Sequence, residues 1–207
     1  MSSVGELPDL PGHEIDQIPK EERLAPEVEV GEVTTLPELA EELQGRPRSE
    51  RVQIAFGWRP TDYQAKVLDY GEAVARAQAA PQKGRQVGAT ELAGKIGADY
   101  ALMNGRTDIL YAAPGQDTAD EMFSEFKDSF KHGLLSLDEF GITKDNEQTW
   151  EFDHGVRAMS RTLGAVGQEK NSGNRGMNPT CVIVDEAHYE QDRVYTEEIE
   201  EFFITHP

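Results

Sequence analysis

The stretch Lys83-Gly84-Arg85-Gln86-Val87-Gly88-Ala89-Thr90 constrains this chain most, because its spacing is close to that of a phosphate-binding loop. The usual pattern, G-x-x-x-x-G-K-[ST], places a lysine directly before the final hydroxyl residue. Here Ala89 fills that lysine position, and Lys83 stands where the first glycine belongs. Two interpretations follow: the lysine has moved to the front of a working loop, or the stretch is a structural glycine-rich turn.

A phosphate loop requires inward-facing backbone N–H groups, a helix N-terminus behind them and a cation. Gly84 and Gly88 permit the tight backbone, and Thr90 opens a predicted helix with a hydroxyl suited to Mg²⁺. Lys83 offers the cation from the front of the loop, and Arg85 is a second candidate cation. The loop therefore predicts a nucleotide site only if other parts of the chain agree.

Charge is the strongest global signal in the composition. The 207 residues hold 39 Asp and Glu against 20 Lys and Arg, a formal net charge of -19. Such a field repels phosphate backbones, which by itself argues against a nucleic-acid partner. Proteins adapted to molar salt carry the same acidity under strong screening, and we favour a halophilic source, in which case the acidity says little about partners.

Further exclusions follow from simple patterns. A single cysteine, Cys181, excludes an intramolecular disulfide and a cysteine-based metal cluster. No apolar run approaches the roughly 18 residues of a membrane span, and the N-terminus has no basic-then-apolar signal pattern. We therefore expect a soluble, intracellular protein that has no membrane partner.

The chain divides near residue 50. Residues 1–50 are acidic, rich in Pro and Gly and poor in aromatic residues, which predicts a largely disordered arm or an interaction arm. Within it, apolar positions at helical spacing over 36–43 predict one short, transient helix. Residues 51–207 are predicted to form the folded domain.

Helices and short apolar strands alternate in that domain. Helices are predicted over 63–78, 90–103, 117–131 and 195–201; buried strands over 107–114 and 180–185; and a hairpin over 149–159. This alternation predicts an α/β fold, a parallel sheet covered by helices on both faces.

An acidic pair ends the second apolar strand. Asp185 follows Val182-Ile183-Val184 at the predicted carboxyl end and can hold Mg²⁺ through its water shell. Glu186 can orient and deprotonate an attacking water. An apolar strand that ends in Asp-Glu is common in proteins without this chemistry, but together with the loop it predicts a site for ATP and Mg²⁺.

Two smaller features fit the same site. Tyr63 and Gln64, at a predicted helix start, can stack on and hydrogen-bond an adenine, although a buried Tyr beside a solvated Gln is an equally simple explanation. Arg175, in a Gly- and Asn-rich segment, can bring charge to a γ-phosphate here or in a neighbouring subunit, or can simply face solvent.

These residues together resemble a known family. Residues 56–207 resemble the ATPase domain of the large subunit of viral, phage-type DNA-packaging terminases, a P-loop fold of the RecA-like class. The resemblance is carried by Arg59-Pro60 with Tyr63-Gln64, Lys83 to Thr90, Leu110 to Pro114, Arg175-Gly176, and Val182 to His188. Some terminases carry the loop lysine at the front, so Lys83 agrees with the family.

The resemblance implies a motor that hydrolyses ATP and moves double-stranded viral DNA into a capsid. It implies a portal protein and a terminase small subunit as partners, assembly as a homo-oligomeric ring, and the cytoplasm of an infected prokaryotic host as location. It also implies a coupling motif near the end of the chain, for which Thr205 is the matching position.

The chain departs from the family pattern because the nuclease domain that normally follows is not present before Pro207. The ATPase domain is therefore expected to be incomplete at its C-terminus. Two alternatives stay open: the first lobe of a superfamily-two helicase, since Asp185-Glu186-Ala187-His188 spells a helicase box, and a catalytically inactive nucleotide-binding subunit. Ala89 argues against the helicase, which normally keeps a lysine there.

Overall fold

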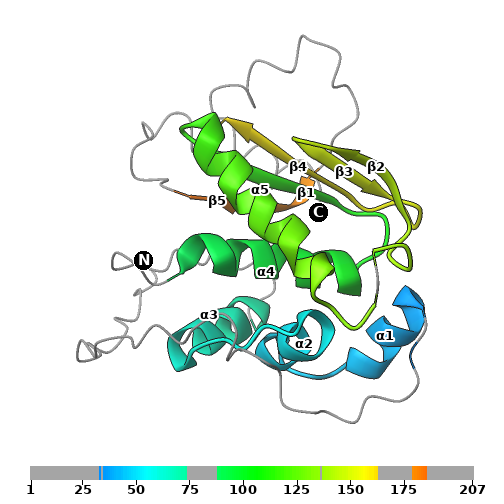
Figure 1. Cartoon of the computed structure of the whole chain (residues 1–207). Helices are drawn as coiled ribbons and strands as arrows, with labels where there is room; N and C mark the ends of the chain where they lie inside the picture. The colour runs from blue at the N-terminus through cyan, green and yellow to red at the C-terminus, as the bar shows by residue number, and fades with distance from the viewer. Residues whose placement is uncertain (1–32, 34, 74–87, 136, 163–178, 186–207) are drawn as a thin grey trace, which may run out of the picture.

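The computed structural model describes residues 33, 35–73, 88–135, 137–162 and 179–185. Helices dominate the first half of the described chain and strands the second (Figure 1). The helices are α1 (Leu36–Leu43), α2 (Arg48–Phe56), α3 (Asp62–Ala73), α4 (Ala89–Met103) and α5 (Gln116–Lys131). The strands are β1 (Asp108–Ala113), β2 (Ile142–Asn146), β3 (Thr149–Phe152), β4 (Arg157–Thr162) and β5 (Pro179–Val184).

The five strands form one sheet in the order β2-β3-β4-β1-β5. Strand β1 pairs in parallel with both β4 and β5, whereas β2, β3 and β4 pair antiparallel. Strand β1 is apolar and buried on both sides, as expected for the centre of a parallel sheet. The predicted α/β class is therefore confirmed, but the sheet is mixed: β4, β1 and β5 form its parallel part, and β2 and β3 add antiparallel strands.

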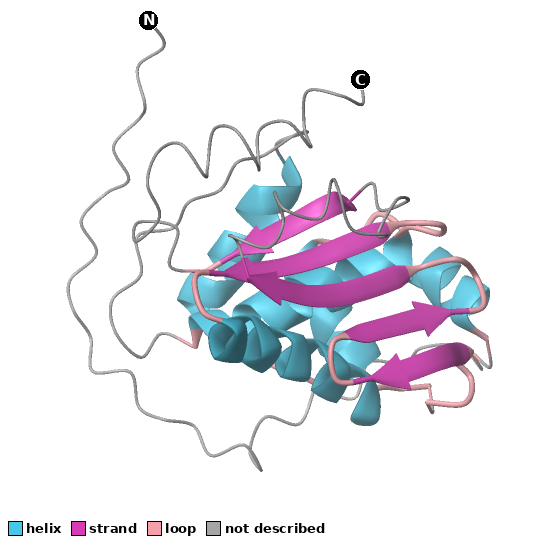
Figure 2. Ribbon diagram, turned by 90° about the horizontal axis from the view of Figure 1, so that it is seen from above, coloured by secondary structure: helices cyan, strands magenta, loops and turns pink. Residues whose placement is uncertain are grey.

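Helices α4 and α5 lie side by side against the sheet, and α1 to α3 pack beyond α4 (Figures 1 and 2). In Figure 2 the helices of the described residues all lie on one face of the sheet. The sequence predicts helices on both faces; within the described ranges only one face has them.

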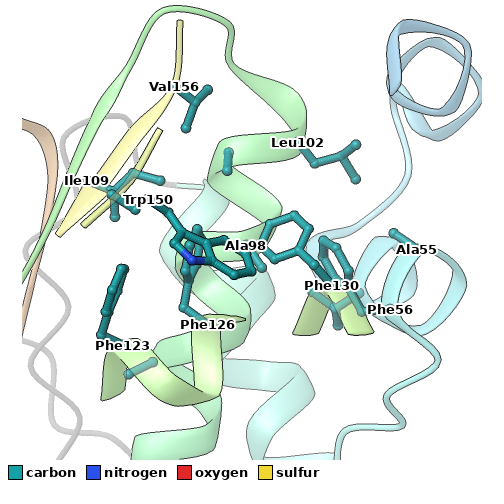
Figure 3. Packing of buried hydrophobic residues seen from close by; sticks show 14 of the residues in the cluster. Ala55, Phe56, Ala98, Leu102, Ile109, Phe123, Phe126, Phe130, Trp150 and Val156 are labelled. Carbon is teal, nitrogen blue, oxygen red and sulfur yellow. The ribbon is translucent and has the colours of Figure 1, made fainter. Parts of the chain in front are cut away.

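Aromatic side chains fill the space between α5 and the sheet (Figure 3). Phe126 packs edge-on against Phe130 and Trp150, with ring centroids 5.0 and 6.0 Å apart. Phe123 stacks on Phe126 at 5.7 Å. Aromatic pairs in these geometries add to the stability that burial provides, so α5 is held firmly over β1, β3 and β4.

The acidic N-terminal region enters this packed body earlier than composition predicts. Thr35 caps α1 in a capping box with Glu38, and Leu39 and Leu43 are fully buried. Helix α2 crosses residue 50, so a domain boundary there divides one packed helix. The helix predicted over 36–43 is confirmed as α1. Because Leu39 and Leu43 are buried, residues 35–50 belong to the folded body, while residues 1–32 and 34 lie outside the described part.

A buried ion cluster fixes α2 against α4. The Asp99 carboxylate, 1% exposed, accepts from Arg51 at 2.7 Å and from Arg48 at 2.9 Å. Arg51 also donates to the backbone oxygen of Arg46 at 2.7 Å. Buried charges are tolerated only when they are paired and hydrogen-bonded in this way.

None of the described helices combines the length and apolar character of a bilayer span.

Candidate functional site

The N-terminus of α4 is formed by the last residues of the predicted phosphate loop. Gly88 is the helix N-cap and has a φ of 66°, a left-handed conformation that favours glycine. Its carbonyl oxygen accepts the first helical hydrogen bond, from Leu92 at 2.9 Å. Ala89 and Thr90 are the first residues of the helix, as the sequence predicts. A glycine cap brings no side-chain acceptor of its own to the first-turn N–H groups, which is the arrangement that anion sites use.

The fold brings this helix end to the carboxyl edge of the parallel strands. Helix α4 connects to β1 through residues 104–107 alone, so the two elements run in opposite directions. Fifteen helical residues span about 22 Å, and the six residues of β1 span about 20 Å. The start of α4 therefore returns to the end at which β1 and β5 finish. In open parallel sheets, ligands bind at this edge.

Asp185 stands at the same edge. Its backbone N–H donates to the carbonyl of Ala112 at 3.1 Å, which continues the β5–β1 ladder one residue past Val184. The Cδ1 atom of Ile183 lies 3.4 Å from the position of a Cβ at Gly97, so β5 packs against the middle of α4. Thr90 lies about 10 Å from Gly97 along the helix axis, and Asp185 lies about 7 Å from Ile183 along the strand. Both directions lead toward the carboxyl edge.

Gln64 contacts the loop from α3. It is 6% exposed, and its Nε2 atom lies 2.9 Å from the position that a Cβ would occupy at Gly88. Two reciprocal hydrogen bonds with Thr61 fix the Gln64 side chain. Gln64 Oε1 accepts from the backbone N–H of Thr61 at 2.9 Å, and the backbone N–H of Gln64 donates to Thr61 Oγ1 at 3.3 Å. The sequence predicts Gln64 near an adenine; it is buried against Gly88, and its neighbour Tyr63 is partly exposed on α3.

A contact between the segment that joins α2 to α3 and the first turn of α4 was not predicted from the sequence. Trp58, 5% exposed, donates its indole N–H to Glu91 Oε1 at 2.8 Å. Glu91 is in the first turn of α4, and its Oε2 lies 3.5 Å from the Cβ position of Gly88. The sequence shows a tryptophan just before Arg59-Pro60, but it does not indicate a bond to Glu91, because the two residues are 33 positions apart.

The end of β4 adds a further polar group to this edge. Asp120 of α5 accepts from Gln116 Nε2 at 2.8 Å and shares a short hydrogen bond with the buried hydroxyl of Ser160. Arg161, the next residue of β4, donates to the Ser160 carbonyl at 2.8 Å. Arg161 therefore places a guanidinium near the end of β4, at the carboxyl edge of the parallel strands. The sequence predicted no site residue at this position.

Cys181 of β5 is a partly buried free thiol. It packs against the core on the helix side of the sheet. Burial raises the pKa of its thiol to about 12, an effect that Arg48 only partly offsets. The thiol is therefore neutral at physiological pH, which makes it a poor nucleophile and a poor metal ligand.

Several predicted site residues lie outside the described residues. They are Lys83, Gly84, Arg85, Gln86, Val87, Arg175, Glu186 and Thr205. The described members of the predicted site are Tyr63, Gln64, Gly88, Ala89, Thr90 and Asp185.

The donor types at this edge suit a hydrated magnesium ion. Thr90 contributes a hydroxyl and Asp185 a carboxylate, both hard oxygen donors, and Mg²⁺ usually keeps several waters beside one or two carboxylates. The described ranges contain no group of three or more His, Cys, Asp or Glu that could enclose a metal without other ligands. Two oxygen donors would leave most positions around an octahedral Mg²⁺ to water or to other ligands.

Comparison with known proteins adds no family assignment: the sequence matches no protein-family model and no curated protein.

Proposed function

We propose that this chain is the nucleotide-binding part of an ATP-hydrolysing motor of the terminase large-subunit type. The feature that supports the proposal is that the glycine-capped start of α4 and the end of β5 at Asp185 both lie toward the carboxyl edge of β1 and β5. A helix N-terminus attracts phosphate through its N–H groups and its dipole. An acidic residue at the end of the neighbouring strand is suited to hold the accompanying Mg²⁺.

In this proposal each residue has one task. The backbone of Gly88 and Ala89 contacts phosphate, and Thr90 and Asp185 orient the Mg²⁺ that neutralises charge on the phosphate oxygens. Gln64 packs against Gly88 and keeps the turn in place. Lys83 would supply the loop cation and Glu186 would activate water, and both assignments rest on the sequence alone.

The further partners follow from the family resemblance only. They are double-stranded viral DNA, a portal protein, a terminase small subunit and further copies of the chain in a ring. We therefore expect any ATP hydrolysis to be stimulated by double-stranded DNA, within an infected prokaryotic cell.

The first test is binding of Mg·ATP to the full 207-residue chain by titration calorimetry. We expect Asp185→Asn to weaken affinity on the order of tenfold, the usual effect of losing a group that orients a metal's shell. Asp128→Asn is the matched control, because Asp128 pairs with Lys131 near the end of α5, away from the proposed site. Equal affinity in wild type and Asp185→Asn would remove the magnesium assignment.

Two more variants test the residues outside the described ranges. Lys83→Ala should reduce ATP affinity, and unchanged affinity would show that no lysine has moved to the front of the loop. Glu186→Gln should retain ATP binding but lose hydrolysis, in the chain itself or in a longer form that hydrolyses ATP. Full hydrolysis by Glu186→Gln would require another general base.

A further inference from the structure

Trp58 occupies a buried position that a purely apolar side chain could also fill. It is buried beside α4, and Lys95 Nζ lies 5.8 Å from its ring centroid and donates to Ser129 Oγ at 3.0 Å. Leu or Phe could fill such a space, but among large apolar side chains only tryptophan adds a ring N–H, which requires a partner when buried. That partner is the carboxylate of Glu91, at 2.8 Å.

Glu91 places a negative charge beside the proposed phosphate site. Its carboxylate lies next to Gly88, with Oε2 3.5 Å from the Cβ position of that residue. The first turn of α4 attracts carboxylates for the same reason that it attracts phosphate. A carboxylate in that turn and an incoming triphosphate therefore compete for the same end of the helix.

We infer that Trp58 is a positioning residue for nucleotide binding, which acts by holding the Glu91 carboxylate at the side of α4. The inference rests on the proposed nucleotide site. With the indole N–H in place, one carboxylate oxygen stays engaged with the segment between α2 and α3. Without this donor, the carboxylate is able to turn across the N–H groups of the first helical turn and oppose phosphate.

Two substitutions of Glu91 separate this role from a structural one. Glu91→Asp keeps the charge but is too short to preserve the bond to Trp58, whereas Glu91→Gln removes the charge. We expect Glu91→Asp to weaken Mg·ATP binding about fivefold, the effect of one unit charge about 4 Å from another in bulk water. Glu91→Gln should bind at least as tightly as wild type. A merely structural bond would make both variants weaker, or neither.

Trp58→Phe provides the second arm. It removes the donor and keeps most of the ring, and should weaken Mg·ATP binding to the same extent as Glu91→Asp. The double variant Trp58→Phe with Glu91→Gln should return to the affinity of Glu91→Gln alone. Trp150→Phe is the matched control, because Trp150 also donates its indole N–H to a carboxylate, that of Asp145, in the β2–β3 hairpin.

The outcomes distinguish this inference from the proposed function. Affinities are measured by titration calorimetry on the full chain, with thermal unfolding recorded for each variant. If wild type binds Mg·ATP and needs Asp185, but Glu91→Asp binds as wild type does, the inference is wrong and the proposed function stands. If the double variant stays as weak as Trp58→Phe, the inference is also wrong. If wild type binds no nucleotide, both fail.

Discussion

The side-chain amide nitrogen of Gln64 lies 2.9 Å from the point that a Cβ atom would occupy at Gly88, so a methyl group there would require the end of the Gln64 side chain to shift. Gly88→Ala would meet two penalties, the contact with Gln64 and a left-handed φ of 66°. The conformational penalty alone is about 1–2 kcal/mol. We expect a clear fall in thermal stability together with weaker Mg·ATP binding.

Two controls divide those penalties. Gly45 has a φ of 82° and nothing within 4 Å of its Cβ position, so Gly45→Ala reports the conformational penalty alone. Adding Gln64→Ala to Gly88→Ala relieves the contact and should recover part of the lost stability. If Gly88→Ala unfolds at the same temperature as Gly45→Ala, the contact with Gln64 has no energetic consequence.

This contact also marks how far the sequence predicts the site. The glycine pattern predicted a turn at Gly88 and a helix from Thr90, because both depend on local backbone preferences. The approach of Gln64, and the bond from Trp58 to Glu91, depend on how α3 packs against α4. Such packing joins residues more than twenty positions apart and leaves no periodic signal in one sequence.

The Asp99 cluster predicts that breaking a buried ion pair lowers the free energy of unfolding much more than breaking ion pairs nearer the surface. Asp99→Ala leaves Arg51, 4% exposed, and Arg48 without the carboxylate that both contact. Breaking a buried pair in this way costs about 3–5 kcal/mol, so we expect urea unfolding to show a loss of that size. Arg46→Ala removes two partly exposed pairs, with Glu42 and Glu50, and should cost no more than about 1 kcal/mol. Similar losses in the two variants would contradict the assigned burial.

The hairpin predicts a local acid sensitivity. A hydrogen bond from the Trp150 indole, helped by Lys127, lowers the pKa of Asp145 below its usual value. A lowered folded-state pKa means that the unfolded chain binds the proton more readily. The stabilisation is therefore present above the unfolded value near pH 4 and is lost as pH falls through the lower folded value.

The measurement compares urea unfolding of wild type and Asp145→Asn from about pH 2 to pH 6. The difference in unfolding free energy should favour wild type at the upper end and shrink toward the lower end. Trp150→Phe keeps the carboxylate but removes the donor, so its pH dependence should be flatter than that of wild type. A difference between wild type and Asp145→Asn that grows on acidification would contradict the assigned direction.

The fold was predictable where local pattern and burial agree. The apolar runs that became β1 and β5, the helical spacing of α5 and the hairpin between β3 and β4 were predicted close to their observed bounds. Strand β2 was missed because Ile142–Asn146 is mostly polar and exposed, as an edge strand can be. Helix α2 was missed because its buried side includes the charged Arg51, whose partner Asp99 lies 48 positions away, a contact that no periodicity indicates.

The approach of α4 to the sheet depends on Gly97. A Cβ at this position would overlap the hydroxyl of Tyr111 and lie 2.8 Å from its Cζ, inside a site that is buried on both elements. Alanine favours a helix over glycine by about 1 kcal/mol, but overpacking costs about 1–3 kcal/mol. We expect Gly97→Ala to be destabilised in thermal unfolding, whereas Gly105→Ala, with nothing within 4 Å, should not show this steric loss.

The same substitution tests whether the site depends on the position of α4. Tyr111→Phe removes the overlapping hydroxyl, so the double variant should recover part of the stability lost by Gly97→Ala. Gly97→Ala should also weaken Mg·ATP binding, because a helix pushed off β1 and β5 carries Gly88 and Thr90 away from Asp185. If Gly97→Ala is less stable but binds Mg·ATP as wild type does, a shift of α4 leaves the contacts of the ligand intact. The start of α4 and Asp185 at the end of β5 would then not form one site.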